Sequence, residues 1–149
     1  MPHFVHTPMS DPGSEIRLLR LFPDSDFSSP IQVELFCPQN HSIWSSVLRL
    51  GDSTCTCRIQ VNGNDFNVRV NMDAALRHPR HPTDARILWI DAICIDQKDN
   101  NERSVQVANM RKIYEQALRV IVWLGVEADD TGRLMYYLAG YLQQITWRS

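Results

Sequence analysis

The chain has 149 residues, a formal net charge of −2 and a hydrophobic fraction of 44%. These values are typical of one soluble globular domain with its own core. The balanced charge argues against a nucleic-acid binder that works through a general basic surface. No apolar run reaches the roughly 18 to 20 residues that a membrane span needs.

The N-terminus and the cysteines indicate a cytoplasmic protein. The first residues lack the basic start and the continuous apolar stretch of a secretory signal. The four cysteines are therefore predicted to be reduced thiols. Cys55 and Cys57 could form half of a zinc site, but no second pair of ligands stands at a matching spacing, so we expect no bound metal.

The N-terminal half is predicted to be rich in β-structure. Residues 1–14 contain Pro, His, Ser and Gly and are expected to form a flexible leader. Strands are expected at 15–22 and at 31–36. Segment 57–70 predicts a β-hairpin because two alternating runs flank a turn that contains glycine. Asn71 is expected to cap a short helix that follows the hairpin.

The C-terminal half changes to an alternation of apolar strands and amphipathic helices. Residues 86–92 and 118–125 predict two buried strands, whose near-continuous apolar character suits a parallel sheet. The segment 101–117 between them has helical periodicity, and a last helix is expected from 129 onward. This order predicts a right-handed βαβα unit. The expected fold class is therefore α/β, with a parallel-sheet core and a β-rich N-terminal part.

Carboxylates end both apolar runs of RILWIDAICIDQ, at Asp91 and at Asp96, which Gln97 follows. In an open parallel sheet, ligands bind beyond the carboxyl ends of the strands, so these side chains could line a cleft. A simpler interpretation is that Asp96 or Asp99 caps the next helix and that Asp91 hydrogen-bonds a turn. Spacing alone favours the simpler interpretation.

Glu102 and Arg103 open the helix that follows. Glu102 suits the positive end of the helix dipole, and Arg103 could reach Asp91 or Asp96 to hold the loop. A solvated first turn without specific partners explains both residues more simply, and we favour it.

The run LWIDAICIDQKDNNERSVQVANMRKIYEQALRVIVWLG, at 88–125, closely resembles the central block of the fungal heterokaryon-incompatibility (HET) domain. The pattern of that family runs approximately LWIDAxCINQ, then ERSxQVxxMxxIYxxAxxVxVWLG. Asp96 stands where the family usually has Asn. The hairpin, the short helix and the opening strands also look like the family's. The resemblance therefore implies a single HET domain over 15–149, one that ends earlier than full HET domains do.

Segment 37–50 departs from this resemblance. The family normally carries a strand of the form YxALSYxWGD here, whereas the chain reads HSIWSSVLRLGD at 41–52. Codons exist for 41–51 that, read one base later, encode TAYGALSYVW, which restores the family motif. We therefore hypothesise that 37–50 is translated out of frame.

The resemblance implies a signalling or interaction domain that acts in fungal non-self recognition and programmed cell death, through self-association or another signalling protein. No cofactor is implied for this role. HET domains are similar in pattern to TIR domains, some of which hydrolyse NAD. That analogy implies an alternative, an NAD glycohydrolase with Glu127 as its catalytic carboxylate, although acidic residues at a helix N-terminus need no catalytic role. A further alternative is an inactive decoy or pseudogene-like fragment.

Overall fold

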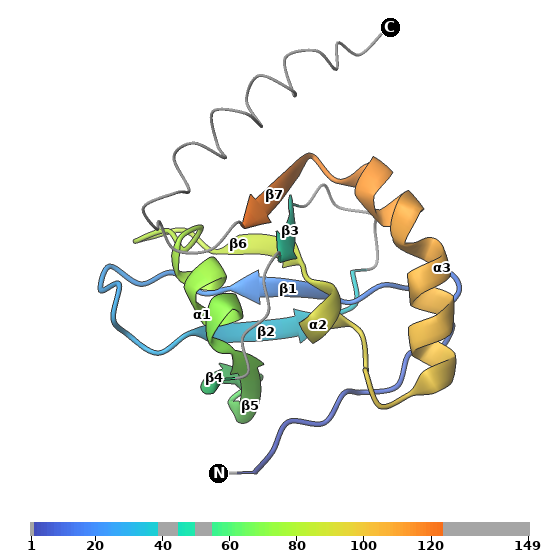
Figure 1. The fold of residues 1–149 in the computed structure, drawn as a ribbon, viewed down its shortest axis with the longest axis horizontal. Coiled ribbons are helices and arrows are strands. Elements are labelled where there is room, and N and C mark those ends of the chain that lie inside the picture. The colour runs from blue at the N-terminus through green and yellow to red at the C-terminus, as the bar shows by residue number, and fades with distance from the viewer. Residues whose placement is uncertain (1, 39–44, 50–54, 124–149) are drawn as a thin grey trace, which may run out of the picture.

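The computed structural model describes residues 2–38, 45–49 and 55–123, although the backbone alone is described for 45–49 and for 122 (Figure 1). The described elements are, in chain order, β1 (Leu18–Leu21), β2 (Gln32–Phe36), β3 (Ser45–Arg49), β4 (Thr56–Val61), β5 (Asn64–Arg69), α1 (Val70–Arg77), β6 (Arg86–Trp89), α2 (Asp91–Cys94), α3 (Asn100–Gln116) and β7 (Arg119–Trp123).

The strands form one seven-stranded sheet in the order β5-β4-β2-β1-β6-β3-β7. β3 pairs in parallel with both β6 and β7, whereas β1 pairs antiparallel with β2 and with β6. The protein is therefore mixed α/β. The N-terminal strands extend the same sheet: β1 pairs antiparallel with β2 and β6, β2 pairs in parallel with β4, and β4 pairs antiparallel with β5.

The predicted hairpin is confirmed as β4 and β5. Its turn consists of Asn62 and Gly63, with φ angles of 51° and 75°. Positive φ at both central residues matches the twist of the flanking strands, which explains why this position favours an Asn-Gly pair. The side-chain oxygen of Asn62 also accepts a 2.8 Å hydrogen bond from the amide of Leu35, and so ties the turn to β2.

The predicted cap of α1 is wrong. The helix begins at Val70, directly after β5, and Arg69 in the capping position makes no side-chain hydrogen bond to the helix. Asn71 therefore lies inside the first turn. The amide of Val70 donates instead to the carbonyl of Cys55, 3.1 Å away, because the chain passes from the hairpin into the helix without an intervening loop.

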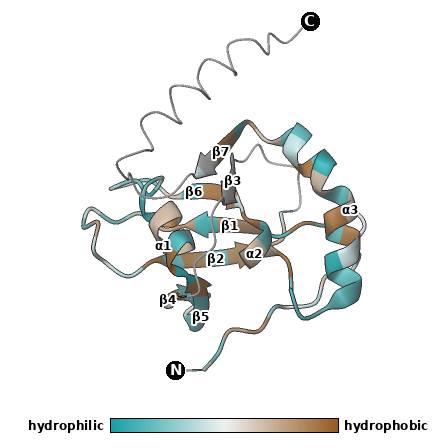
Figure 2. Ribbon diagram, in the orientation of Figure 1, coloured by the Kyte–Doolittle hydropathy of each residue, from teal (hydrophilic) through white to brown (hydrophobic). Residues whose placement is uncertain are grey.

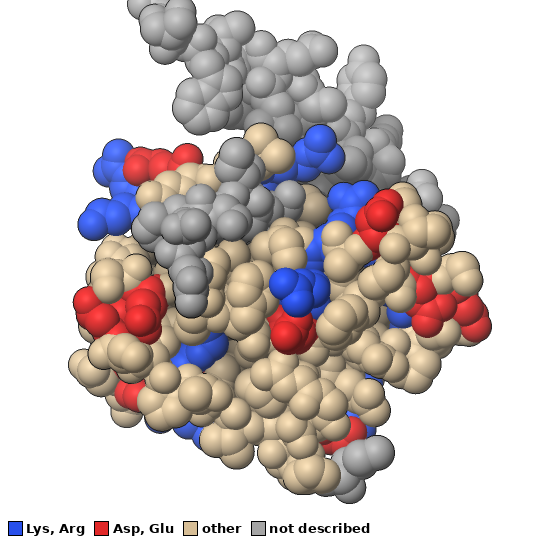
Figure 3. Space-filling view, turned by 180° about the vertical axis from the view of Figure 1, so that it is seen from behind, with Lys and Arg blue, Asp and Glu red and all other residues tan. Residues whose placement is uncertain are grey.

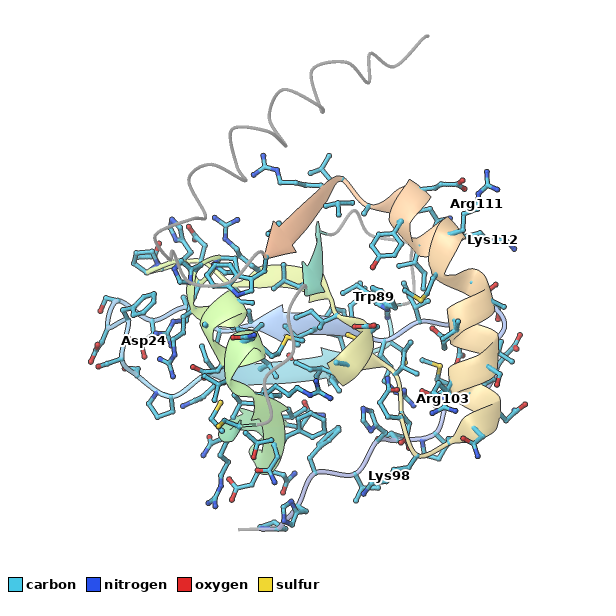
Figure 4. The ribbon with its side chains drawn as sticks, viewed as in Figure 1. Asp24, Trp89, Lys98, Arg103, Arg111 and Lys112 are labelled. Atoms are coloured by element: carbon cyan, nitrogen blue, oxygen red, sulfur yellow. The ribbon has the colours of Figure 1, made fainter. Side chains whose placement is uncertain are left out.

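The core lies between the middle of the sheet and the helices (Figure 2). Its largest fully buried side chain is Trp89 at the end of β6. Figure 4 labels Trp89. The ring of Trp89 meets that of Tyr114 on α3 edge to face, with centroids 5.9 Å apart. This pair anchors α3, whose bounds agree with the predicted helix. Strand β6 therefore ends in the core, directly before the segment 91–97 that contains Asp91, Asp96 and Gln97.

Strand β7 agrees with the second predicted strand, but its expected burial is wrong. Leu118 is 75% exposed and Val120 is 42% exposed, while Ile121 and Trp123 are partly buried. The physical reason is position, because β7 is the last strand of the described sheet and has a strand partner on one side only. The helix expected from 129 lies outside the described residues. No described helix has the length and apolar character that crossing a membrane requires.

The leader lies against the body of the domain. The amide of Phe4 donates to the carbonyl of Asp65, 3.0 Å away, and the amide of Asp65 donates to Pro2, 3.2 Å away. The leader thus pairs along the free edge of β5. The rings of Phe4 and Phe66 also pack edge to face, at 5.8 Å. These contacts give a fixed position to a segment that was expected to be flexible. They bring it next to the loop that follows α2, which contains Asp96 and Gln97.

Candidate functional site

The motif residues meet in the loop that joins α2 to α3. Asp91 begins the single turn of α2, and its carboxylate accepts a 2.7 Å hydrogen bond from the amide of Ala92. The side chain of Gln97 reaches back and donates to the backbone carbonyl of Asp91, 3.0 Å away. Asp99 accepts hydrogen bonds from the amides of Asn101 and Glu102 and caps α3. The simpler interpretation of Asp91 and Asp99 is therefore confirmed.

Glu102 forms a buried ion pair with Arg17, the residue directly before β1. Both side chains are almost fully buried, at 3% and 4% exposure. The guanidinium binds in a fork: Nη1 contacts Oε1, and Nη2 contacts Oε2 at 2.9 Å. Two parallel charge-assisted hydrogen bonds are the strongest form of this interaction. The expectation of a solvated first turn is therefore wrong for Glu102, although Arg103 is exposed.

The buried pair also fixes the chain around it. Glu102 accepts a 2.7 Å hydrogen bond from the amide of Asp96. Arg17 donates to the carbonyl of Cys94 at 3.1 Å and to the carbonyl of Thr7 at 2.6 Å. One pair thus connects α2, the motif loop, α3 and the leader. Sequence reasoning missed Arg17, for which the sole signal was a charged residue at the start of an apolar strand.

Gln106, one turn beyond Glu102, is fully buried and performs a similar function. Its amide nitrogen donates to the carbonyls of Pro12 and Glu15, at 2.7 and 2.8 Å. A buried amide that satisfies two backbone carbonyls fixes the path of the segment that contains them. The family motif ERSxQV therefore supplies two buried side chains that hold the leader.

A pocket of about 530 Å³ opens between the leader, β5 and the motif loop. His6, Phe66 and Asp96 line it, and so does Lys98, an exposed residue beside the leader (Figure 4). His6 is 8% exposed, and its Nε2 lies 2.8 Å from the carbonyl oxygen of Ile93. Of the residues predicted to form a cleft, Asp96 and Gln97 line this pocket, whereas Asp91, Glu102 and Arg103 are not among its lining residues.

One buried thiol, that of Cys94, lies in the described part of the site. Burial raises the pKa of the Cys94 thiol to about 12, so this cysteine is a neutral core group and not a nucleophile. Among the described residues, no three His, Cys, Asp or Glu side chains are grouped so as to hold a metal. Glu127, the candidate catalytic carboxylate, lies outside the described residues.

Charge on the surface is mixed. In the view of Figure 3, basic and acidic side chains alternate over the described part of that face, separated by uncharged residues. Among the described residues, Arg20 pairs with Glu34. The described part of this face therefore offers no broad basic area for the backbone of a nucleic acid.

Two comparisons identify relatives. Residues 41–148 match the family model described as heterokaryon incompatibility protein (HET). The chain is 38% identical, over 150 residues, to heterokaryon incompatibility protein 6, OR allele, of Neurospora crassa. The alignment covers 88% of this chain and 22% of that protein, so the chain spans about a fifth of its relative's length. No solved structure matches the chain.

Proposed function

The chain belongs to the HET family, and on this basis we propose that it is a signalling module of fungal non-self recognition. In this proposal it acts in the cytoplasm, triggers programmed cell death, and works through self-association or another signalling protein. The family match and the relative's printed name support the role in incompatibility.

The observation that carries an interaction role is the outer face of α3. Glu102, Gln106 and Ile113 of the family motif point into the core. Arg103 and Val107 belong to the same motif but are exposed, Val107 by 53%. The described fold does not bury these two side chains. An exposed valine one turn after an exposed arginine suits contact with another protein surface.

Expression in a fungal host tests this role. We expect the chain to cause cell death, and we expect Arg103→Glu and Val107→Asp to reduce it strongly while thermal unfolding stays unchanged. Lys112→Glu, an exposed charge reversal on the same helix, is the matched control. Death that persists in both motif variants, or equal loss in the control, would rule out this surface.

A TIR-like parallel core remains part of the proposal. Its support is that β3 lies between β6 and β7 and is parallel to both, although it precedes them in the chain. Doubly wound sheets use such an order, with the first strand between later ones. Incubation with NAD tests the enzymatic alternative, because NAD loss that Glu127→Ala abolishes would support it.

We further propose that segment 37–50 is read out of frame. Part of it forms β3, the strand that joins β6 to β7. The transcript and genomic sequences across Leu35–Thr54 decide the matter, since a corrected frame would restore YGALSYVWG. An unaltered frame would favour the decoy or pseudogene-like alternative.

A further inference from the structure

In the pocket beside the motif loop, an imidazole nitrogen of His6 and a carboxylate oxygen of Asp96 face each other. A backbone carbonyl can only accept, so Nε2 of His6 must carry the proton that it shares with Ile93, 2.8 Å away. In the neutral ring, Nδ1 is then an acceptor. It faces Oδ1 of Asp96 across 3.8 Å, a distance longer than a hydrogen bond. A donor between these two atoms would satisfy both.

The groups around His6 Nδ1 and Asp96 Oδ1 favour a positively charged donor with an apolar body. Asp96 contributes a negative charge, and its Oδ1 accepts a 3.0 Å hydrogen bond from the amide of Lys98. A carboxylate oxygen can accept a second one. The rings of Phe4 and Phe66 line the same pocket together with Val5. Aromatic rings attract an ammonium group and pack against an apolar body.

We propose that this pocket binds a small primary ammonium compound with an apolar body, whose ammonium group donates to Asp96 and to Nδ1 of His6. The backbone of Asp96 is held by Glu102, so the carboxylate is positioned before any ligand arrives. Lys98, an exposed residue that also lines the pocket, disfavours a second positive charge on the ligand. Because the leader supplies one wall and the motif loop the other, a bound amine would join the two segments.

Ligand-observed and amide NMR on the full chain tests this proposal, with three probes of one shape: 2-phenylethylamine, 2-phenylethanol and phenylacetate. The measurement is made at pH 8.5, where free imidazole is neutral and a primary amine is still mostly charged. We expect the amine to bind with a dissociation constant on the order of 1 mM. Amide shifts should then concentrate at 3–6, 66–67 and 96–98, and phenylacetate should not bind.

Asp96→Asn should weaken amine binding by about 10- to 100-fold, because it removes the charge that accepts the ammonium group. Asp84→Asn is the matched control, since Asp84 is 79% exposed and lies outside the pocket. No amine binding, equal binding by Asp96→Asn, or equal binding of phenylacetate would overturn the proposal. The three-probe series needs no variant, so it decides the matter even if Asp96→Asn unfolds.

Discussion

The two ends of α3 use the same chemistry in opposite surroundings. Near its start, Glu102 pairs with Arg17 at 3% and 4% exposure. Near its end, Glu115 pairs with Arg111 at 59% and 88% exposure. The first pair joins segments far apart in sequence, while the second connects neighbouring turns of one helix. Similar ion pairs therefore differ in role. The buried pair fixes the tertiary structure, whereas the exposed pair lies on the surface of one helix.

The two ends should differ most in the unfolding free energy that is lost when one carboxylate is removed. Glu102→Ala leaves the Arg17 guanidinium buried without its counter-charge and should cost about 3 to 5 kcal/mol of unfolding free energy. Glu115→Ala is the matched control and should cost less than about 0.5 kcal/mol. Urea unfolding measures both. Similar losses for the two variants would mean that burial does not distinguish the pairs.

If Glu102→Ala does not fold, the double variant Arg17→Met with Glu102→Leu provides the test. Replacement of a whole buried pair by apolar side chains is much less costly than removal of one partner. We expect soluble, folded protein from the double variant. Thr7 and Cys94 would still lose a donor to their carbonyls, so recovery should be incomplete.

The carbonyl of Cys94 accepts a hydrogen bond from Arg17, and the buried thiol of Cys94 predicts how stability depends on pH at this end of α3. Burial raises its pKa from 9.0 to about 12, so the folded state keeps a proton that the unfolded state loses. Its contribution to stability is complete below about pH 9 and is lost as the pH rises to about 12. The unfolding free energy should fall more steeply over this window in the wild type than in Cys94→Ala, by up to about 1.4 kcal/mol per pH unit. Equal slopes would contradict the assigned burial.

Gln106 tests whether the start of α3 holds the leader. Gln106→Ala removes the donor to Pro12 and Glu15 and should cost about 1 to 3 kcal/mol. Hydrogen exchange at Phe4 should accelerate as well, because its amide is protected by the docked leader. Gln116→Ala, at the exposed end of the same helix, should change neither quantity.

The smallest effect is expected at the exposed pair. Arg111→Ala should cost very little unfolding free energy, because an exposed ion pair four residues apart on a helix contributes weakly. That loss should vanish at high salt, whereas the loss in Glu102→Ala should persist because salt screens buried charges weakly. A salt-independent loss at Arg111 would show that this end of α3 is more tightly held than its exposure indicates.

Sequence patterns were sufficient to predict those elements that depend on residues close together in the chain. The alternation in β2, the Asn-Gly turn of the hairpin, the period of α3 and its Asp99 cap all depend on residues a few positions apart. The predicted bounds of these elements agree with the structure to within about two residues. The resemblance of 88–125 to the HET pattern identified the family, which the comparisons confirm.

Long-range pairing could not be read from those patterns. Arg17 and Glu102 are 85 residues apart, and nothing near Glu102 shows that its first turn is buried. The pocket depends on the leader, whose composition predicts flexibility. The leader meets β5 through two backbone hydrogen bonds, which any sequence can make, and through one contact between rings 62 residues apart in sequence, those of Phe4 and Phe66. The exposure of β7 follows from its place in the strand order, which strand character alone does not determine.

The position of β3 has a kinetic consequence. It pairs Ser45 with Leu88 on one side and with Arg119 on the other, so each contact closes a long loop. Contacts between residues far apart in sequence are slow to form. The hairpin and α3 should therefore fold early, while β3 and β7 join last. During synthesis, β3 leaves the ribosome long before either of its partners exists. For that interval it is an unpaired strand, which is prone to aggregate. A chaperone that binds it would keep it soluble.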